Sequence, residues 1–181
     1  MKKMICAILA LSLVFALAAC GGSKPEETTA TVANIEGTME ELLNKVIEQR
    51  PVEFSGGVIP IDLTDTSEDG AWAIKSFTGL EDASQITEAA AYEPMIGSIP
   101  FSMVMVRTAE GADPKAVAEA MKSGVDPRKW ICVEADDLKV AGYCDTVMLI
   151  MVSSEHAASV TAQDMVDAFK AVCGGELDFV I

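Results

Sequence analysis

Basic side chains and histidine are scarce in this sequence. Its 181 residues include 13 Lys and Arg against 28 Asp and Glu, and the one histidine is His156. Nucleic acid and anionic lipid surfaces are bound by clustered Lys and Arg, so the composition argues against both as direct electrostatic partners. A single histidine also excludes most zinc sites and leaves only His156 for a histidine-dependent catalytic triad.

The common catalytic and phosphate-binding motifs are also missing. No Gly-x-Ser-x-Gly nucleophile elbow occurs, and the glycine pairs Gly56-Gly57 and Gly174-Gly175 lack the flanking pattern and the lysine of a phosphate loop. The neighbouring acids Asp136-Asp137 and Glu81-Asp82 are too close in sequence to predict two carboxylates facing each other across a cleft. We therefore assign no catalytic, cofactor-binding or metal-binding residues from the sequence.

Cysteine is too sparse for a disulfide framework. Cys6 and Cys20 belong to the N-terminal segment, which leaves Cys132, Cys144 and Cys173. One bridge among these three is possible in an exported protein, but their number is odd. Their neighbours are mostly apolar, which favours buried free thiols that pack as small hydrophobic groups.

Only one long apolar run is present, at the N-terminus. Lys2 and Lys3 precede a run from Met4 to Ala19 that Ser12 alone interrupts. A basic start, an apolar stretch and small residues at its end are typical of a secretory signal. A retained membrane helix is the alternative, but 16 residues would span roughly 24 Å of a hydrocarbon core roughly 30 Å thick.

The end of this run, Leu17-Ala18-Ala19-Cys20 followed by two glycines, resembles the lipobox of bacterial lipoproteins. The resemblance implies cleavage before Cys20, which then carries a thioether-linked diacylglycerol. Loss of Lys2 and Lys3 leaves 11 basic against 28 acidic residues, a mature net charge of about −17. We expect a signal peptide over residues 1–19, a flexible tether over 20–37 and one domain over 38–181.

The periodicity of the domain predicts alternating helices and strands. Expected helices cover residues 38–50, 67–77, 113–124 and 161–173. Expected strands cover 86–92, 101–108, 138–144 and 146–153, with short extended pieces at 58–61 and 130–133. These elements predict a two-layer α+β domain whose antiparallel or mixed sheet has about four to five strands, with helices on one face and a strand-strand-helix duplication.

Parts of the domain also resemble a known family. Pro94–Pro100, the strand that contains Val104, and Val125–Val133 look like a family of small bacterial lipoproteins of unknown function. The likeness covers most of the domain and includes the lipobox. It implies an exported α+β domain and brings no activity, cofactor or catalytic residue with it.

Two stretches are weak candidates for chemistry. Asp65–Gly70 matches the start of a calcium loop, but Ser76 stands where an EF-hand needs a bidentate glutamate, so a helix start is the simpler interpretation. His156 lies in a loop beside Glu155 and could act as a general base, although an exposed loop histidine is the simpler interpretation there too.

The remaining conspicuous side chains are interpreted as packing groups. Trp72 and Trp130 are expected in the core or in a lid over it, rather than as platforms for a ligand. The strand methionines are expected to fill the core rather than to bind copper: Met103, Met105, Met148 and Met151.

Taken with the lipobox, these features favour a non-enzymatic binding or interaction module at the cell envelope. The expected attachment is to the membrane through lipid on Cys20, with an envelope protein as partner and no cofactor or nucleic acid. Two alternatives stay open, a small solute-binding lipoprotein and an envelope hydrolase. A solute-binding protein normally needs two lobes, and a hydrolase needs acids or His156 to converge in a cleft.

Overall fold

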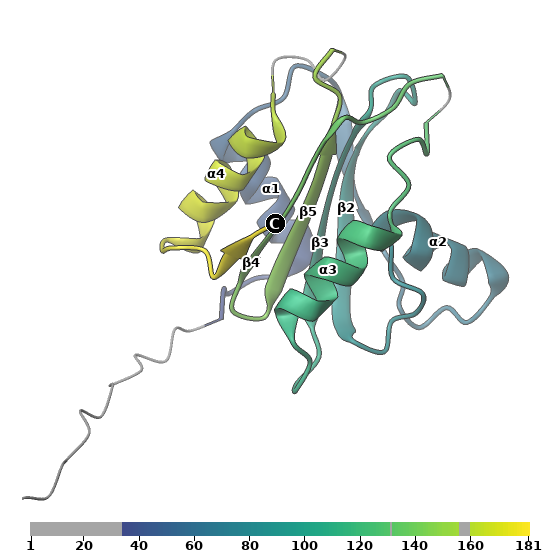
Figure 1. The fold of residues 1–181 in the computed structure, drawn as a ribbon, viewed down its shortest axis with the longest axis vertical. Coiled ribbons are helices and arrows are strands. Elements are labelled where there is room, and N and C mark those ends of the chain that lie inside the picture. The colour runs from purple at the N-terminus through teal and green to yellow at the C-terminus, as the bar shows by residue number, and fades with distance from the viewer. Residues whose placement is uncertain (1–33, 131, 156–159) are drawn as a thin grey trace, which may run out of the picture. The chain divides into compact units, whose positions relative to one another are not determined.

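A computed structural model describes residues 34–130, 132–155 and 160–181 of the chain (Figure 1). The expected signal peptide, Cys20 and His156 lie outside these residues.

The described elements all belong to one compact unit, Val32–Ile181. In chain order they are α1 Met39–Gln49, β1 Gly56–Pro60, α2 Glu68–Thr78, β2 Ile86–Pro94, β3 Phe101–Thr108, α3 Pro114–Gly124, β4 Asp137–Tyr143, β5 Thr146–Val152, α4 Ala162–Cys173 and β6 Phe179–Val180.

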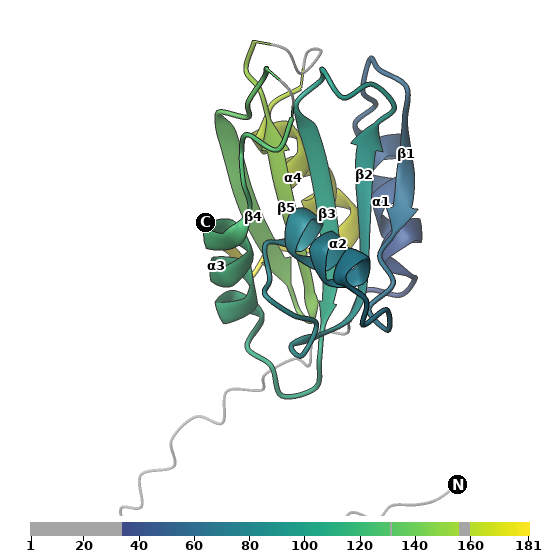
Figure 2. The same ribbon diagram turned by 90° about the vertical axis from the view of Figure 1, so that its right-hand side faces the viewer.

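The strands form one antiparallel sheet in the order β1-β2-β3-β5-β4-β6. β3 and β5 lie side by side at its centre, with Met105 opposite Met148 (Figure 2). Both central strands are almost wholly buried. The α+β class and the antiparallel sheet are therefore confirmed, and the sheet has six strands because Gly56–Pro60 and Phe179–Val180 extend its two edges.

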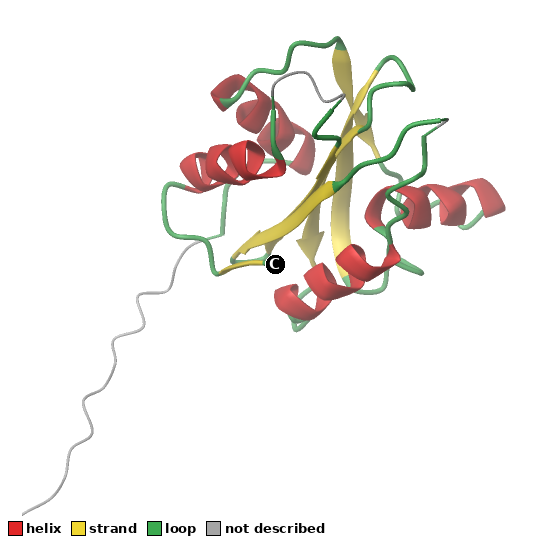
Figure 3. Cartoon of the chain, turned by 45° about the horizontal axis from the view of Figure 1, so that its top comes forward, coloured by secondary structure: helices red, strands yellow, loops and turns green. Residues whose placement is uncertain are grey.

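Helices cover both faces of the sheet, so the domain has three layers rather than the expected two (Figure 3). α1 and α4 pack on one face, where β3 and β5 present Met103 and Ile150 among others. α2 and α3 pack on the opposite face, against side chains such as Val104 and Leu149. Successive strand residues point to opposite faces, and both central strands carry buried apolar side chains on each face, so both faces need cover.

The strand-strand-helix order occurs twice, as predicted, in β2-β3-α3 and β4-β5-α4. The two copies are not equivalent in space, because α3 and α4 lie on opposite faces of the sheet. Local contacts mark the ends of the helices. Thr38 and Thr161 form capping boxes with Glu41 and Asp164, and Gly174 ends α4 in the left-handed conformation.

The segment between α3 and β4 forms no strand in its described residues, 125–130 and 132–136. A short extended piece was expected over the apolar run 130–133. Trp130 is half-buried and packs against the core, whereas Cys132 is exposed with φ at 64°. Among the described residues, no helix is long and apolar enough to cross a membrane.

Arg107, at the end of β3, fastens the chain segment that leads into α1. Its guanidinium donates to the carbonyl oxygen of Gly37 at 2.8 Å and to both carboxylate oxygens of Asp145 at 3.0 and 2.9 Å. Glu88 lies 3.5 Å from the same guanidinium and accepts the backbone N–H of Met39 at 2.8 Å. The start of the domain is thereby held at the end of the sheet that carries the β4–β5 turn.

The ends of α2 and α3 meet backbone to backbone. Gly79 caps α2 with φ at 77°, and a methyl group on Gly124 would overlap the Gly79 carbonyl oxygen. No side chain fits between these two turns, so the contact fixes how α2 sits against α3.

We expect Gly124→Ala to lower the free energy of unfolding by about 2–3 kcal/mol, because the added methyl group overpacks this contact. Helix propensity alone would change stability in the opposite direction, by about 1 kcal/mol. The matched control is Gly97→Ala, whose methyl group would meet nothing within 4 Å. Denaturant unfolding of both variants measures the difference, and equal stabilities would contradict the packing role of Gly124.

Candidate functional site

Three connecting segments meet at the end of the sheet opposite Arg107 (Figure 1). Residues 95–100 join β2 to β3, residues 125–130 and 132–136 lead from α3 into β4, and residues 153–155 follow β5. Met95 and Ile96 are 79% and 59% exposed in the first of these segments. We call this region the loop end of the domain.

A lysine from the segment after α3 reaches into the loop end and is almost fully enclosed there. Lys129 Nζ lies 2.7 Å from Glu93 Oε1, at the end of β2, and 2.9 Å from Ser102 Oγ, near the start of β3. The Ser102 hydroxyl also donates to Glu93 Oε1 at 2.6 Å. The Lys129 and Glu93 side chains are only 15% and 13% exposed, and Ser102 is fully buried.

Aromatic rings enclose the rest of this ammonium group. Lys129 Nζ lies 5.1 Å from the centre of the Phe77 ring and 5.3 Å from that of the Trp130 ring. Both distances are within the range of cation–π attraction. The ion pair, the hydroxyl and the two rings together compensate the removal of this charge from water, and they pin the segment after α3 to the sheet.

Two hollows flank this pinned segment. The first has a volume of about 600 Å³ and is lined by Arg128, Trp130, Cys132, Val133, Glu134, Asp136, Ser153 and Glu155; we call it the acidic hollow. The second has a volume of about 650 Å³ and is lined by Ala71, Trp72, Lys75, Ser76, Glu81, Gly124, Asp126 and Lys129; we call it the tryptophan hollow.

The adjacent acids at the acidic hollow hold neighbouring backbone. Asp136 accepts hydrogen bonds from the backbone N–H and the hydroxyl of Ser154. Asp137 accepts the N–H of Ala162, the first residue of α4, at 2.9 Å. These contacts tie the chain on both sides of residues 156–159 to the start of β4. We therefore assign both carboxylates a structural role.

The calcium-like stretch Asp65–Gly70 forms the start of α2. Ser67 is the N-cap and accepts the N–H of Gly70, while Asp65 accepts the N–H of Ser67 at 2.9 Å. Hydrogen bonds from the Ser67 side chain and backbone lower the pKa of Asp65. Within the described ranges, no group of three or more His, Cys, Asp or Glu side chains is placed to hold a metal ion.

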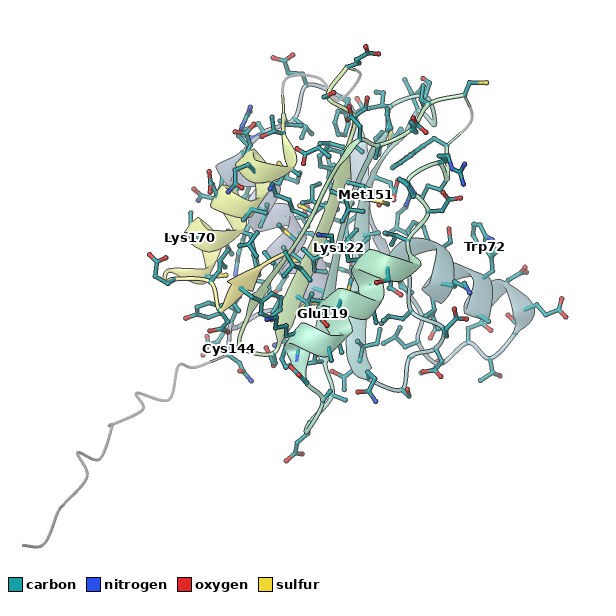
Figure 4. The ribbon with its side chains drawn as sticks, viewed as in Figure 1. Trp72, Glu119, Lys122, Cys144, Met151 and Lys170 are labelled. Carbon is teal, nitrogen blue, oxygen red and sulfur yellow. The ribbon has the colours of Figure 1, made fainter. Side chains whose placement is uncertain are left out.

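The cysteines and tryptophans differ in part from their predicted positions. Cys132 is exposed rather than buried, whereas Cys144 and Cys173 are half-buried. Trp72 is 67% exposed on the outer side of α2 and is therefore neither a core residue nor a covered one (Figure 4). The four strand methionines are fully buried, which confirms their role as core residues.

Comparison with protein-family models, curated proteins and solved structures finds no match for this chain. The site is therefore interpreted from its own geometry.

Sequence reasoning missed the contact between Lys129, Glu93 and Ser102. Two signals for it exist in the sequence. Ser102 places a hydroxyl group in an otherwise apolar part of β3. Lys129 is one of few basic residues in the chain and directly precedes Trp130. A buried hydroxyl needs a partner, but neither signal identifies Glu93, which is 36 residues from Lys129.

We expect Lys129→Met to lower the free energy of unfolding by about 3 kcal/mol, because it leaves the Glu93 carboxylate enclosed without its cation. Adding Glu93→Gln should recover most of that loss. The control is Lys75→Met, which breaks an exposed pair with Glu81 and should cost less than about 1 kcal/mol. Thermal or denaturant unfolding tests this, and equal effects of the two lysine substitutions would contradict the enclosed pair.

The cysteines should differ in reactivity. The pKa of Cys173 is raised to about 12. Burial is the largest cause, and the negative charges of the nearby Cys144 and Asp178 add to it. At pH 8 only about 1 in 10,000 such thiols is ionised, so iodoacetamide should alkylate Cys173 slowly. Alkylation should be fastest at Cys132, because this side chain is exposed. Peptide mapping by mass spectrometry measures the order. The unfolded chain should label Cys132 and Cys173 at similar rates, and equal rates in the folded protein would contradict the burial of Cys173.

Proposed function

We propose that this chain is a bacterial lipoprotein of the kind it resembles, anchored through lipid on Cys20 at the outer face of the cytoplasmic membrane. Its α+β domain then serves as a non-enzymatic binding module of the cell envelope. The observation that carries the proposal is the N-terminal pattern of Lys2, Lys3, the apolar run and Leu17–Cys20. Two acyl chains, at about 0.8 kcal/mol per buried methylene, would hold the domain firmly at the membrane.

The geometry of the domain supports this use. Arg107 fastens residues 35–37 at one end of the sheet, and the tether would attach there. The exposed Met95 and Ile96 lie at the opposite end. A domain held in this way would present its loop end away from the point of attachment.

The polar contacts at the loop end favour binding over catalysis. Ser102 contacts a lysine, as a serine nucleophile with a lysine base would, but its hydroxyl is fully buried and donates to Glu93. A nucleophile must reach its substrate, and this one has no exposed surface. Asp136 and Asp137 are likewise occupied in holding backbone.

The anchor can be tested by metabolic labelling with palmitate in the bacterium that makes the protein. We expect the wild-type protein to be labelled and Cys20→Ala to lose the label while keeping the same melting temperature, because Cys20 lies outside Val32–Ile181, the unit that contains every described element. Cys132→Ala is the matched control and should label like the wild type. Undiminished labelling of Cys20→Ala would overturn the assignment.

The binding role can be tested by recovering partners from envelope extracts with the lipidated protein as bait. A loop-end variant, Met95→Ser with Ile96→Ser, is the control because both side chains are exposed and their loss should leave the fold intact. A partner that the wild type retains and the variant loses would support binding through the loop end. Identical recovery by both would contradict it.

A further inference from the structure

The outer side of α2 carries an aromatic ring that the fold does not use. Trp72, Lys75 and Ser76 follow one another at i, i+3 and i+4 and so share one face of the helix. The buried residues of α2, among them Ile74 and Thr78, lie on its other side. Figure 4 shows Trp72 standing out from α2. A tryptophan that is 67% exposed adds little to the core, so its large apolar surface is available for contact.

The tryptophan hollow begins at this face. Its lining also includes Gly124, Asp126 and Lys129, from the end of α3 and the segment that follows. Its volume of about 650 Å³ is within the roughly 300–1,000 Å³ that is usual for small-molecule sites. The hollow therefore combines one exposed aromatic surface with several polar groups around it.

Every charged side chain that lines this hollow already has a partner of opposite charge. Lys75 lies 2.6 Å from Glu81, Lys129 lies 2.7 Å from Glu93, and Asp126 lies 3.6 Å from Arg128. The four charged groups in the lining are two lysines and two acids. A charged ligand would be repelled by as many groups as attract it, and it would have to compete with these pairs. The hollow is thus matched to an uncharged ligand.

We propose that the tryptophan hollow binds a neutral saccharide, with a sugar ring stacked on Trp72 and its hydroxyls bonded to Lys75, Ser76 and Glu81. A pyranose ring has an apolar C–H face that suits the indole. Each of its hydroxyls both donates and accepts, so it can bond to an ammonium and a carboxylate without breaking their ion pair. This inference rests on the proposed binding role and names the class of ligand.

The test is a titration of the full-length protein, purified in a detergent without a sugar headgroup. The fluorescence of Trp72 is followed in a Trp130→Phe background, where Trp72 is the one remaining tryptophan. The probes are a trimer of N-acetylglucosamine, which is neutral, and the same trimer after deacetylation, which is cationic. We expect saturable quenching by the neutral trimer and at least about tenfold weaker binding of the cationic one.

Trp72→Ala, followed by calorimetry, should weaken binding of the neutral trimer by about tenfold or more with no change in melting temperature, because the ring is exposed. Met95→Ser is the control and should bind like the wild type. Absence of saturable binding, tighter binding of the cationic trimer, or unchanged affinity in Trp72→Ala would each overturn the proposal. The titration does not depend on the lipid, so its failure alongside normal palmitate labelling would leave the proposed anchor intact.

Discussion

The rest of the structure depends on two central strands that carry buried apolar side chains on both of their faces. β3 and β5 pair along their whole length and are buried from Phe101 to Val106 and from Thr146 to Val152. Such a pair is stable in water only with both faces covered. The chain supplies α1 and α4 for one face and α2 and α3 for the other, so the number of layers follows from the composition of these two strands.

Much of this fold could be predicted from the sequence because its signals are local. Thr38 with Glu41, Asp113 before Pro114, and Gly174 mark helix ends through contacts a few residues apart. The face on which each helix packs could not be predicted in this way, since an amphipathic helix carries no mark of which side of a sheet it will cover. The sequence of residues 176–181 fits either a short strand or a frayed tail, because the two residues of β6 are too few to show a periodicity.

The candidate site was harder to predict because its parts are distant in sequence. Lys129 meets Glu93 and Ser102 only after three segments have been brought together at the loop end. Trp72 was misassigned because tryptophan is usually at least partly buried, and one exposed ring on the outer side of a helix breaks no local rule. Both cases concern residues whose environment is set by tertiary packing.

The backbone contact between Gly79 and Gly124 has a consequence for molecular recognition. It joins α2, the helix that contains Trp72, to the end of α3, and α3 continues into the segment that contains Lys129. Lys129 is itself fixed to β2 through Glu93. The parts of the lining that come from α2 and from the segment after α3 are therefore fixed relative to each other without a ligand. Association would order little more than the ends of a few side chains, and the entropy lost on binding would be correspondingly small.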